Sequence, residues 1–150
     1  MRFIALALAA LAVAPAASAG LPNPCTLLTN AQVAKVLGSK VVEATPTGNG
    51  RYGMCTWKGA NMARPDAMPA QRSLIVQVST TTEAAFKKVA EQTPGAVRIA
   101  GIGETAYSTH GALKSVNAFR HGYALMVVAG LTVDPLATAK AAAKLAVAKL

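Results

Sequence analysis

Acidic side chains are scarce in this 150-residue sequence, which has 6 Asp and Glu against 15 Lys and Arg and a formal net charge of +9. A positive surplus of this size favours acidic partners through long-range attraction. The basic residues are nevertheless scattered, and only Lys87 and Lys88 are adjacent. No basic cluster carries interleaved aromatic residues, so the charge pattern does not indicate nucleic-acid binding.

Long apolar runs are also missing. The longest, residues 3–14, is well short of the roughly 20 residues that a membrane-spanning helix needs. It follows a positively charged start at Arg2 and precedes the small-residue sequence Ala17-Ser18-Ala19. This layout predicts a secretory signal peptide over residues 1–19, cleaved between Ala19 and Gly20, rather than an uncleaved membrane anchor. We therefore expect no integral membrane span after cleavage.

The remaining residues, 20–150, are of ordinary length for a single domain. Without Arg2, 14 basic and 6 acidic side chains remain, a net charge of +8. Export predicts a periplasmic or secreted bacterial location. There the partner would be an anionic envelope component or an acidic protein, and nucleic acid is excluded by the compartment.

Cysteine is limited to Cys25 and Cys55. Two cysteines in an exported chain most simply form one disulfide. The alternative is a pair of free thiols with a catalytic role. The sequence contains no Cys-x-x-Cys spacing and places no histidine near either cysteine, so we expect a structural disulfide.

Histidine is limited to His110 and His121, and no spacing between them and acidic residues indicates a metal site. The sequence also lacks a Gly-x-Ser-x-Gly elbow, a Ser-x-x-Lys pair and a Cys-His arrangement. We therefore expect no catalytic residue and no metal. The alternative is a small hydrolase-like periplasmic enzyme whose site assembles from Glu104, Tyr107 and either His110 or His121.

The segment Gly101-Ile102-Gly103-Glu104-Thr105-Ala106 matches the dinucleotide-binding pattern Gly-x-Gly-x-x-Ala. That pattern requires a strand before it, a helix after it and an acidic residue about 20 positions later. Here a helical segment precedes it and residues 105–108 look extended. We expect no cofactor, and interpret the two glycines as a tight turn into a strand.

Three helices are indicated by their capping residues. Thr29 and Gln32 form a capping box for a helix that ends at Gly38. Thr80-Thr81-Thr82-Glu83 predicts a second capping box, and Asp134 with Pro135 begins the last helix.

Apolar alternation predicts about six strands, over residues 41–45, 51–58, 74–78, 105–108, 116–120 and 123–129. Residues 97–102 are extended or looped, and His121-Gly122 is a two-residue hairpin turn. The run 123–128 is apolar on both faces, which predicts a central strand under helices. The fold class is α+β: a mostly antiparallel sheet packed by three helices, in the order helix, three strands, helix, three strands, helix.

The longest irregular stretch is predicted over residues 59–71, with Pro65 and Pro69. Loops on a rigid scaffold often carry binding residues. Arg64 and Arg72 in and beside this stretch are therefore our candidate contact region. Together these features favour a non-enzymatic binding or interaction module.

Several short segments carry a family resemblance: Pro24-Cys25-Thr26-Leu27-Leu28-Thr29, Val36-Leu37-Gly38, Cys55-Thr56-Trp57 and Gly101-Ile102-Gly103-Glu104-Thr105-Ala106-Tyr107. The chain resembles a group of exported bacterial domains of unknown function, best known among actinobacterial envelope lipoproteins. The resemblance spans nearly all of residues 20–150. It implies an α+β sandwich, PsbP-like, with a disulfide between Cys25 and Cys55. It implies no catalytic residues, and the chain departs from the group in lacking a lipobox cysteine.

Overall fold

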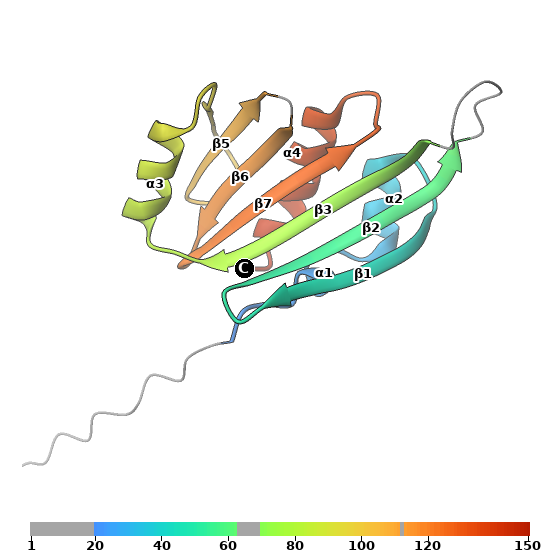
Figure 1. Ribbon diagram of the computed structural model, residues 1–150, viewed down its shortest axis with the longest axis horizontal. Coiled ribbons are helices and arrows are strands. Elements are labelled where there is room, and N and C mark those ends of the chain that lie inside the picture. The colour runs from blue at the N-terminus through green and yellow to red at the C-terminus, as the bar shows by residue number, and fades with distance from the viewer. Residues whose placement is uncertain (1–19, 63–69, 112) are drawn as a thin grey trace, which may run out of the picture.

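The computed structural model describes residues 20–62, 70–111 and 113–150. They form a single antiparallel sheet of seven strands, in the spatial order β1-β2-β3-β7-β6-β5-β4, together with four helices (Figure 1). The predicted α+β class with an antiparallel sheet is confirmed. The signal peptide predicted over residues 1–19 lies outside the described residues.

The strands are longest at β2 and β3 and shorten towards the β4 edge. They are β1 (Val41–Asn49), β2 (Tyr52–Met62), β3 (Ala70–Thr80), β4 (Val97–Ile99), β5 (Thr105–His110), β6 (Lys114–Arg120) and β7 (Tyr123–Gly130). The helices are α1 (Pro24–Leu27), α2 (Asn30–Leu37), α3 (Glu83–Gln92) and α4 (Pro135–Val147). None of these helices is long and apolar enough to cross a membrane.

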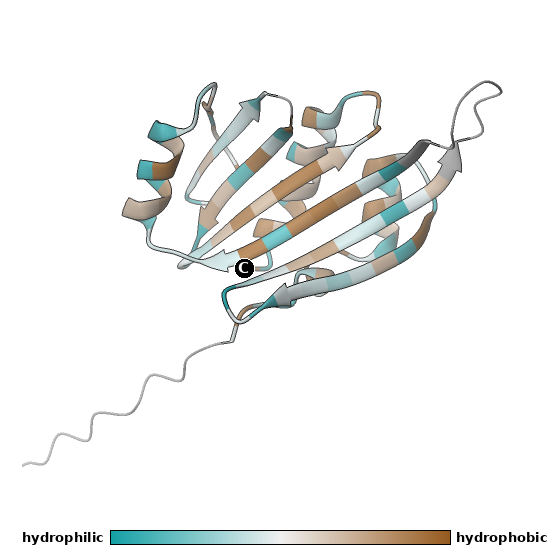
Figure 2. Ribbon diagram, in the orientation of Figure 1, coloured by the Kyte–Doolittle hydropathy of each residue, from teal (hydrophilic) through white to brown (hydrophobic). Residues whose placement is uncertain are grey.

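Three helices, α1, α2 and α4, pack on one face of the sheet, where they lie behind the strands in Figure 1. The main hydrophobic core lies between them and the sheet. Apolar residues concentrate along β3 and β7 at the centre (Figure 2). The largest fully buried side chains of the core are Trp57, Leu37, Leu74, Leu125, Val33, Val76, Val78, Val116 and Val127.

Helix α2 begins and ends where its capping residues predict. The Thr29 Oγ1 accepts a hydrogen bond of 3.2 Å from the Gln32 backbone N–H, and the Gln32 Oε1 accepts one of 2.9 Å from the Thr29 N–H. This reciprocal pair satisfies two N–H groups that the first turn leaves without partners. Gly38 ends the helix in the left-handed region, at a φ of 61°.

Helix α4 is also confirmed, with the Asp134 carboxylate accepting a hydrogen bond of 3.0 Å from the Ala137 N–H. Its buried side is almost entirely alanine, and small side chains let the helix lie close to β6 and β7. The apolar side of this basic helix therefore packs on the sheet.

The start of α3 differs from the sequence prediction. Thr82 is the N-cap, accepting a hydrogen bond of 3.2 Å from the Ala85 N–H, so the predicted capping box at Thr80 is wrong. Thr80 instead ends strand β3, where it pairs with Tyr123. The strand therefore continues to Thr80, and the helix begins after the cap at Thr82.

Two elements were missing from the predicted order of three helices and about six strands. The short helix α1 begins at Pro24, where the Asn23 Oδ1 accepts a hydrogen bond of 3.0 Å from the Cys25 N–H. Strand β4 forms at the edge because Val97–Ile99 pair with β5. Both elements are too short to give a periodic signal.

The predicted irregular stretch 59–71 is wrong at both of its ends, which belong to strands. Strand β2 continues to Met62 and β3 begins at Ala70, and the two residues pair across the sheet. Only residues 63–69, with Arg64, Pro65 and Pro69, lie outside the described residues.

The hairpin turn between β6 and β7 is confirmed. His121 and Gly122 both have positive φ, 49° and 85°, and Arg120 pairs with Tyr123 across the turn. Strand β7 lies at the centre of the sheet, as its apolar run predicts. Helix α4 covers one of its faces, and on the other face Ala124 at the start of β7 packs against the cluster around Phe86 of α3.

Candidate functional site

On the face of the sheet that points away from α1, α2 and α4, the described residues place one helix, α3, at the β5–β6 side. There α3 places Phe86 against Tyr107 and Phe119, with ring centroids 5.3 and 5.9 Å apart. No helix in the described part of the chain packs on this face over the centres of β2, β3 and β7.

Two parallel rows of side chains cross this uncovered area, and we call them the open face. Strand register brings them together, since alternate residues of each strand point to the same side. The first row is Thr45, Thr56, Ile75, Val128 and Ser115, and the second is Thr47, Met54, Gln77, Met126 and Asn117. Most of these side chains are only half-buried, shielded by their cross-strand neighbours.

The open face contains no charged side chain, although the chain as a whole is strongly basic. The nearest ions, Glu43 and Lys58, occupy the next row and form an ion pair of 2.8 Å. Thr45 donates a second hydrogen bond, of 2.7 Å, to Glu43. The hydrogen bond from Lys58, followed by that from Thr45, holds the pKa of Glu43 below its ordinary value. The face is therefore neutral, with a paired charge at its border.

A groove of about 260 Å³ runs between α3 and the open face. Phe86 and Val89 form its helical wall, while Gln77, Met126 and Asn117 contribute from the sheet. The Asn117 amide is held by a hydrogen bond of 2.8 Å that it donates to the Ser115 hydroxyl. The groove thus joins an apolar wall to two side-chain amides, which is a surface suited to an uncharged partner.

Helix α3 is held against the sheet by an aromatic contact at Tyr107. Tyr107 is only 6% exposed and lies under Phe86. Burial raises the pKa of the Tyr107 hydroxyl, and a hydrogen bond with Thr93 at the end of α3 partly offsets that rise. Tyr107 is therefore a packing residue that fixes one wall of the groove.

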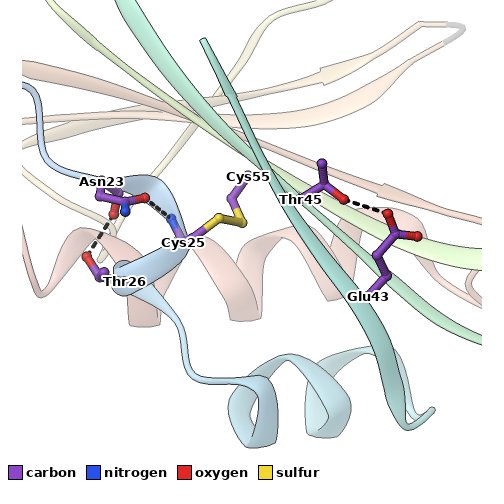
Figure 3. Close-up of a disulfide and its surroundings, with 6 residues drawn as sticks. All are labelled: Asn23, Cys25, Thr26, Glu43, Thr45 and Cys55. Atoms are coloured by element: carbon purple, nitrogen blue, oxygen red, sulfur yellow. Dashed lines mark hydrogen bonds between the residues drawn. A yellow bond between two sulfur atoms is a disulfide. The ribbon is translucent and has the colours of Figure 1, made fainter.

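The predicted disulfide is confirmed and lies directly behind the open face. It joins Cys25 of α1 to Cys55 of β2, with an S–S distance of 1.95 Å and a Cα–Cα distance of 5.1 Å (Figure 3). Figure 3 places Thr45 and Glu43 on the opposite side of β1 from the sulfur atoms. Cys55 points inward between Met54 and Thr56, which belong to the open face. The bridge therefore ties α1 to the strand that carries them.

Glu104 and His121, two members of the alternative catalytic group, do lie together. The Glu104 Oε1 accepts a hydrogen bond of 3.0 Å from the His121 backbone N–H, and the imidazole Nε2 is 3.7 Å away. Both side chains are well exposed, His121 in the β6–β7 turn and Glu104 directly before β5. The carboxylate fixes the turn through the backbone and does not orient the imidazole toward a nucleophile.

The other two members lie elsewhere. His110 is at the far end of β5 from Glu104, with its Nε2 3.2 Å from the Ser108 Oγ. A strand of this length spans roughly 20 Å. Tyr107 is covered by α3. The structure therefore does not bring Glu104, Tyr107 and His110 together. Within the described ranges, no group of three His, Cys, Asp or Glu side chains could hold a metal ion.

The segment from Gly101 to Ala106 leads into a strand, as interpreted from the sequence. Gly101 and Gly103 both have positive φ, 78° and 61°, and β5 begins at Thr105. No helix follows, so the segment lacks the element on which a dinucleotide phosphate would bind.

The two residues of the candidate contact region, Arg64 and Arg72, have different outcomes. Arg64 lies outside the described residues. Arg72 is on β3, and its Nη1 donates hydrogen bonds to the Leu37 and Gly38 carbonyl oxygens at the end of α2. This guanidinium is therefore engaged in holding a helix to the sheet.

The open face itself was missed by the sequence analysis. Its clearest signal is in β3, where Ile75 and Gln77 alternate with the buried residues Leu74, Val76 and Val78. In β7 the same face carries Met126 and Val128, whose apolar character suggested burial under a helix. Only the position of α3 shows that no helix lies over them.

No protein-family model, curated protein or solved structure matches the chain. The geometry of this site is therefore the main basis for assigning a function.

Proposed function

We propose that the protein is an exported, non-enzymatic interaction module of the bacterial cell envelope that binds a protein partner through the open face. One observation carries this proposal: half-buried apolar and uncharged polar side chains cover the centre of a sheet face over which no described helix packs. In antiparallel sheets the solvated face is usually polar. An apolar centre on such a face is typical of a binding surface.

The residues at the centre have the chemistry of a protein interface. Met54 and Met126 flank Gln77 in one row, and Ile75 and Val128 are neighbours in the next. Methionine is enriched at interfaces because its flexible thioether adapts to the partner's shape. The threonine hydroxyls and the two amides supply hydrogen bonds that set orientation.

The basic surface elsewhere would act on the approach of the partner. Without the predicted signal peptide the net charge is +8, which attracts an acidic protein over distance and raises the association rate. The contact itself would bury no charge, since the open face is neutral. We therefore expect a complex that forms faster at low salt and persists at high salt, because screening weakens long-range attraction and leaves apolar contact intact.

Location outside the cytoplasm is supported by two features. The signal peptide predicted over residues 1–19 indicates export, and the Cys25–Cys55 disulfide is the kind of crosslink that persists in oxidising compartments. The resemblance to exported envelope domains points the same way. We place the module in the periplasm or in the secreted fraction.

The test is affinity capture from an envelope extract, with the exported protein as bait at low and high salt. A Met126→Lys variant introduces a charge at the centre of the open face. Leu145→Lys is the matched control, because Leu145 is a 37% exposed residue of α4 on the other side of the sheet. Circular dichroism and thermal unfolding would show that both variants fold.

We expect the bait and the Leu145→Lys control to capture the same protein at both salt concentrations, and Met126→Lys to lose it. A partner that Met126→Lys still binds would contradict the assignment to the open face. A partner released at high salt would show that the cationic surface makes the contact instead.

A further inference from the structure

Two neighbouring loops at one end of the sheet expose aliphatic side chains that no other part of the described chain covers. Leu113, in the β5–β6 turn, is 73% exposed. Leu131 and Val133, between β7 and α4, are 59% and 98% exposed. We call these three side chains the loop tips. Their exposure to solvent is unfavourable, because apolar surface has a lower free energy when it is removed from water.

The two loops lie side by side because β6 and β7 are neighbours. Ser115 pairs with Val128, so moving outward along both strands brings Leu113 beside the end of β7 at Gly130. In Figure 1 the start of β6 and the β7–α4 loop both lie at the upper end of the sheet. In Figure 2 the β7–α4 loop carries the brown of apolar residues. The loop tips thus form one surface.

The shape of this surface is set by local structure. The Thr109 hydroxyl donates a hydrogen bond of 3.0 Å to the Leu113 carbonyl oxygen and accepts one of 3.1 Å from the Ser115 N–H. Leu131 has a φ of 54°, in the left-handed region that costs a bulky residue about 1–2 kcal/mol. Strained backbone of this kind concentrates at functional segments. The two hydrogen bonds therefore fix the backbone at Leu113 before any partner arrives.

Charge near the loop tips favours an anionic partner. Lys114 follows Leu113 directly, and no carboxylate among the described residues pairs with it. His110 is its partner across the hairpin. Asp134, which follows Val133 in the sequence, directs its carboxylate to the first turn of α4.

The projecting shape of the loop tips and the neighbouring lysine favour a lipid surface over a protein partner. The loop tips carry only Leu and Val, on projecting loops rather than in a groove. Aliphatic residues at projecting tips, beside a lysine, fit the boundary between acyl chains and anionic headgroups.

We propose that the loop tips bind the surface of an anionic phospholipid bilayer. Leu113, Leu131 and Val133 enter the boundary between headgroups and acyl chains, while Lys114 stays at the phosphates. The net positive charge of the chain adds long-range attraction to such a surface. The loop tips share no residue with the open face, so this inference stands independently of the proposed protein partner.

The experiment is sedimentation of the exported protein with vesicles, either of phosphatidylcholine mixed with phosphatidylglycerol or of phosphatidylcholine alone. The test variant is the double substitution Leu113→Ser with Val133→Ser. Its matched control is Val42→Ser with Val97→Ser, since these valines are 57% and 52% exposed elsewhere on the molecule. Thermal unfolding of each variant confirms that it folds.

We expect binding to the anionic vesicles and a loss of about tenfold in the loop-tip variant, because two aliphatic side chains no longer leave water. The control variant should stay within about twofold of the unsubstituted protein, and Lys114→Gln should weaken binding to anionic vesicles severalfold. Unchanged binding by the loop-tip variant would overturn the proposal. So would an equal loss in the control, or equal binding to both kinds of vesicle.

Discussion

The guanidinium of Arg72 donates a hydrogen bond of 2.7 Å to the carbonyl oxygen of Leu37, which lies 35 residues earlier in the chain. The same Nη1 donates one of 2.8 Å to the Gly38 carbonyl oxygen. Carbonyl groups at the end of a helix lack intrahelical partners and carry partial negative charge, so a cation there is favourable. Arg72 thus joins the end of α2 to strand β3.

Replacing Arg72 with Ala should therefore destabilise the protein by about 1–2 kcal/mol, through two lost charge-assisted hydrogen bonds and the partial exposure of the helix end. Urea unfolding would measure the change in the free energy of unfolding. Arg51→Ala serves as the control, since Arg51 lies in an exposed turn and should change stability by less than about 0.5 kcal/mol. Equal effects from the two substitutions would contradict the structural role of Arg72.

Gly103→Ala should be clearly more destabilising than Gly101→Ala. Both glycines have positive φ, which costs an alanine about 1–2 kcal/mol. A Cβ at position 103 would also lie 2.5 Å from the Phe119 carbonyl oxygen, whereas one at position 101 meets nothing within 4 Å. We expect roughly 3 kcal/mol or more at position 103 and about 1 kcal/mol at 101, measured by denaturant unfolding. Similar values would show that the backbone can shift to relieve the contact.

Loss of the disulfide should lower stability by about 3–4 kcal/mol, because the bridge closes a loop of 30 residues. The variant with both Cys25→Ala and Cys55→Ala would give this value against the oxidised protein in urea. A thiol alkylator applied to the unreduced, denatured protein should add no mass. Two added labels would show that the exported protein does not carry the bridge.

Stability should fall as the pH drops through the acidic range, with Glu43 contributing. Its folded pKa lies below the ordinary value of 4.5, so the folded state holds the proton less tightly than the unfolded state. The contribution is therefore present above that value and is lost as the pH falls through the folded pKa.

Carboxyl titration by NMR would test the cause of this shift. Lys58→Gln should raise the pKa of Glu43 toward its ordinary value, because Lys58 supplies the main hydrogen bond. Lys88→Gln, a charge-matched change on an exposed position of α3, should leave the Glu43 pKa as it is. A Glu43 pKa that does not respond to Lys58→Gln would show that the ion pair does not form in solution.

Local signals in the sequence were sufficient for the features that depend on a few adjacent residues. Thr29 with Gln32 and Asp134 with Pro135 begin helices because capping is a short-range interaction between a side chain and backbone three residues away. His121 and Gly122 form a tight turn for the same reason. The pairing of Cys25 with Cys55 also followed, because only two cysteines were present to pair.

Features that depend on distant residues were decided by the tertiary structure. Thr80 could cap a helix or end a strand, and pairing with Tyr123 decides for the strand. The sequence predicted Arg72 to be a surface contact residue, and only the structure shows that it donates a hydrogen bond to the end of α2. Glu104 and His110 lie six positions apart, but an extended strand carries them to opposite ends.

The candidate binding surface belongs to this second group. Met126 and Val128 are apolar whether or not a helix covers them, so the amino-acid sequence determined their hydrophobicity but not their exposure. The helices α1, α2 and α4 all pack on the other face, and α3 contacts the sheet near Tyr107, Phe119 and Ala124. Whether a residue is buried depends on which other residues pack against it in space, so the tertiary structure decided the exposure of Met126 and Val128.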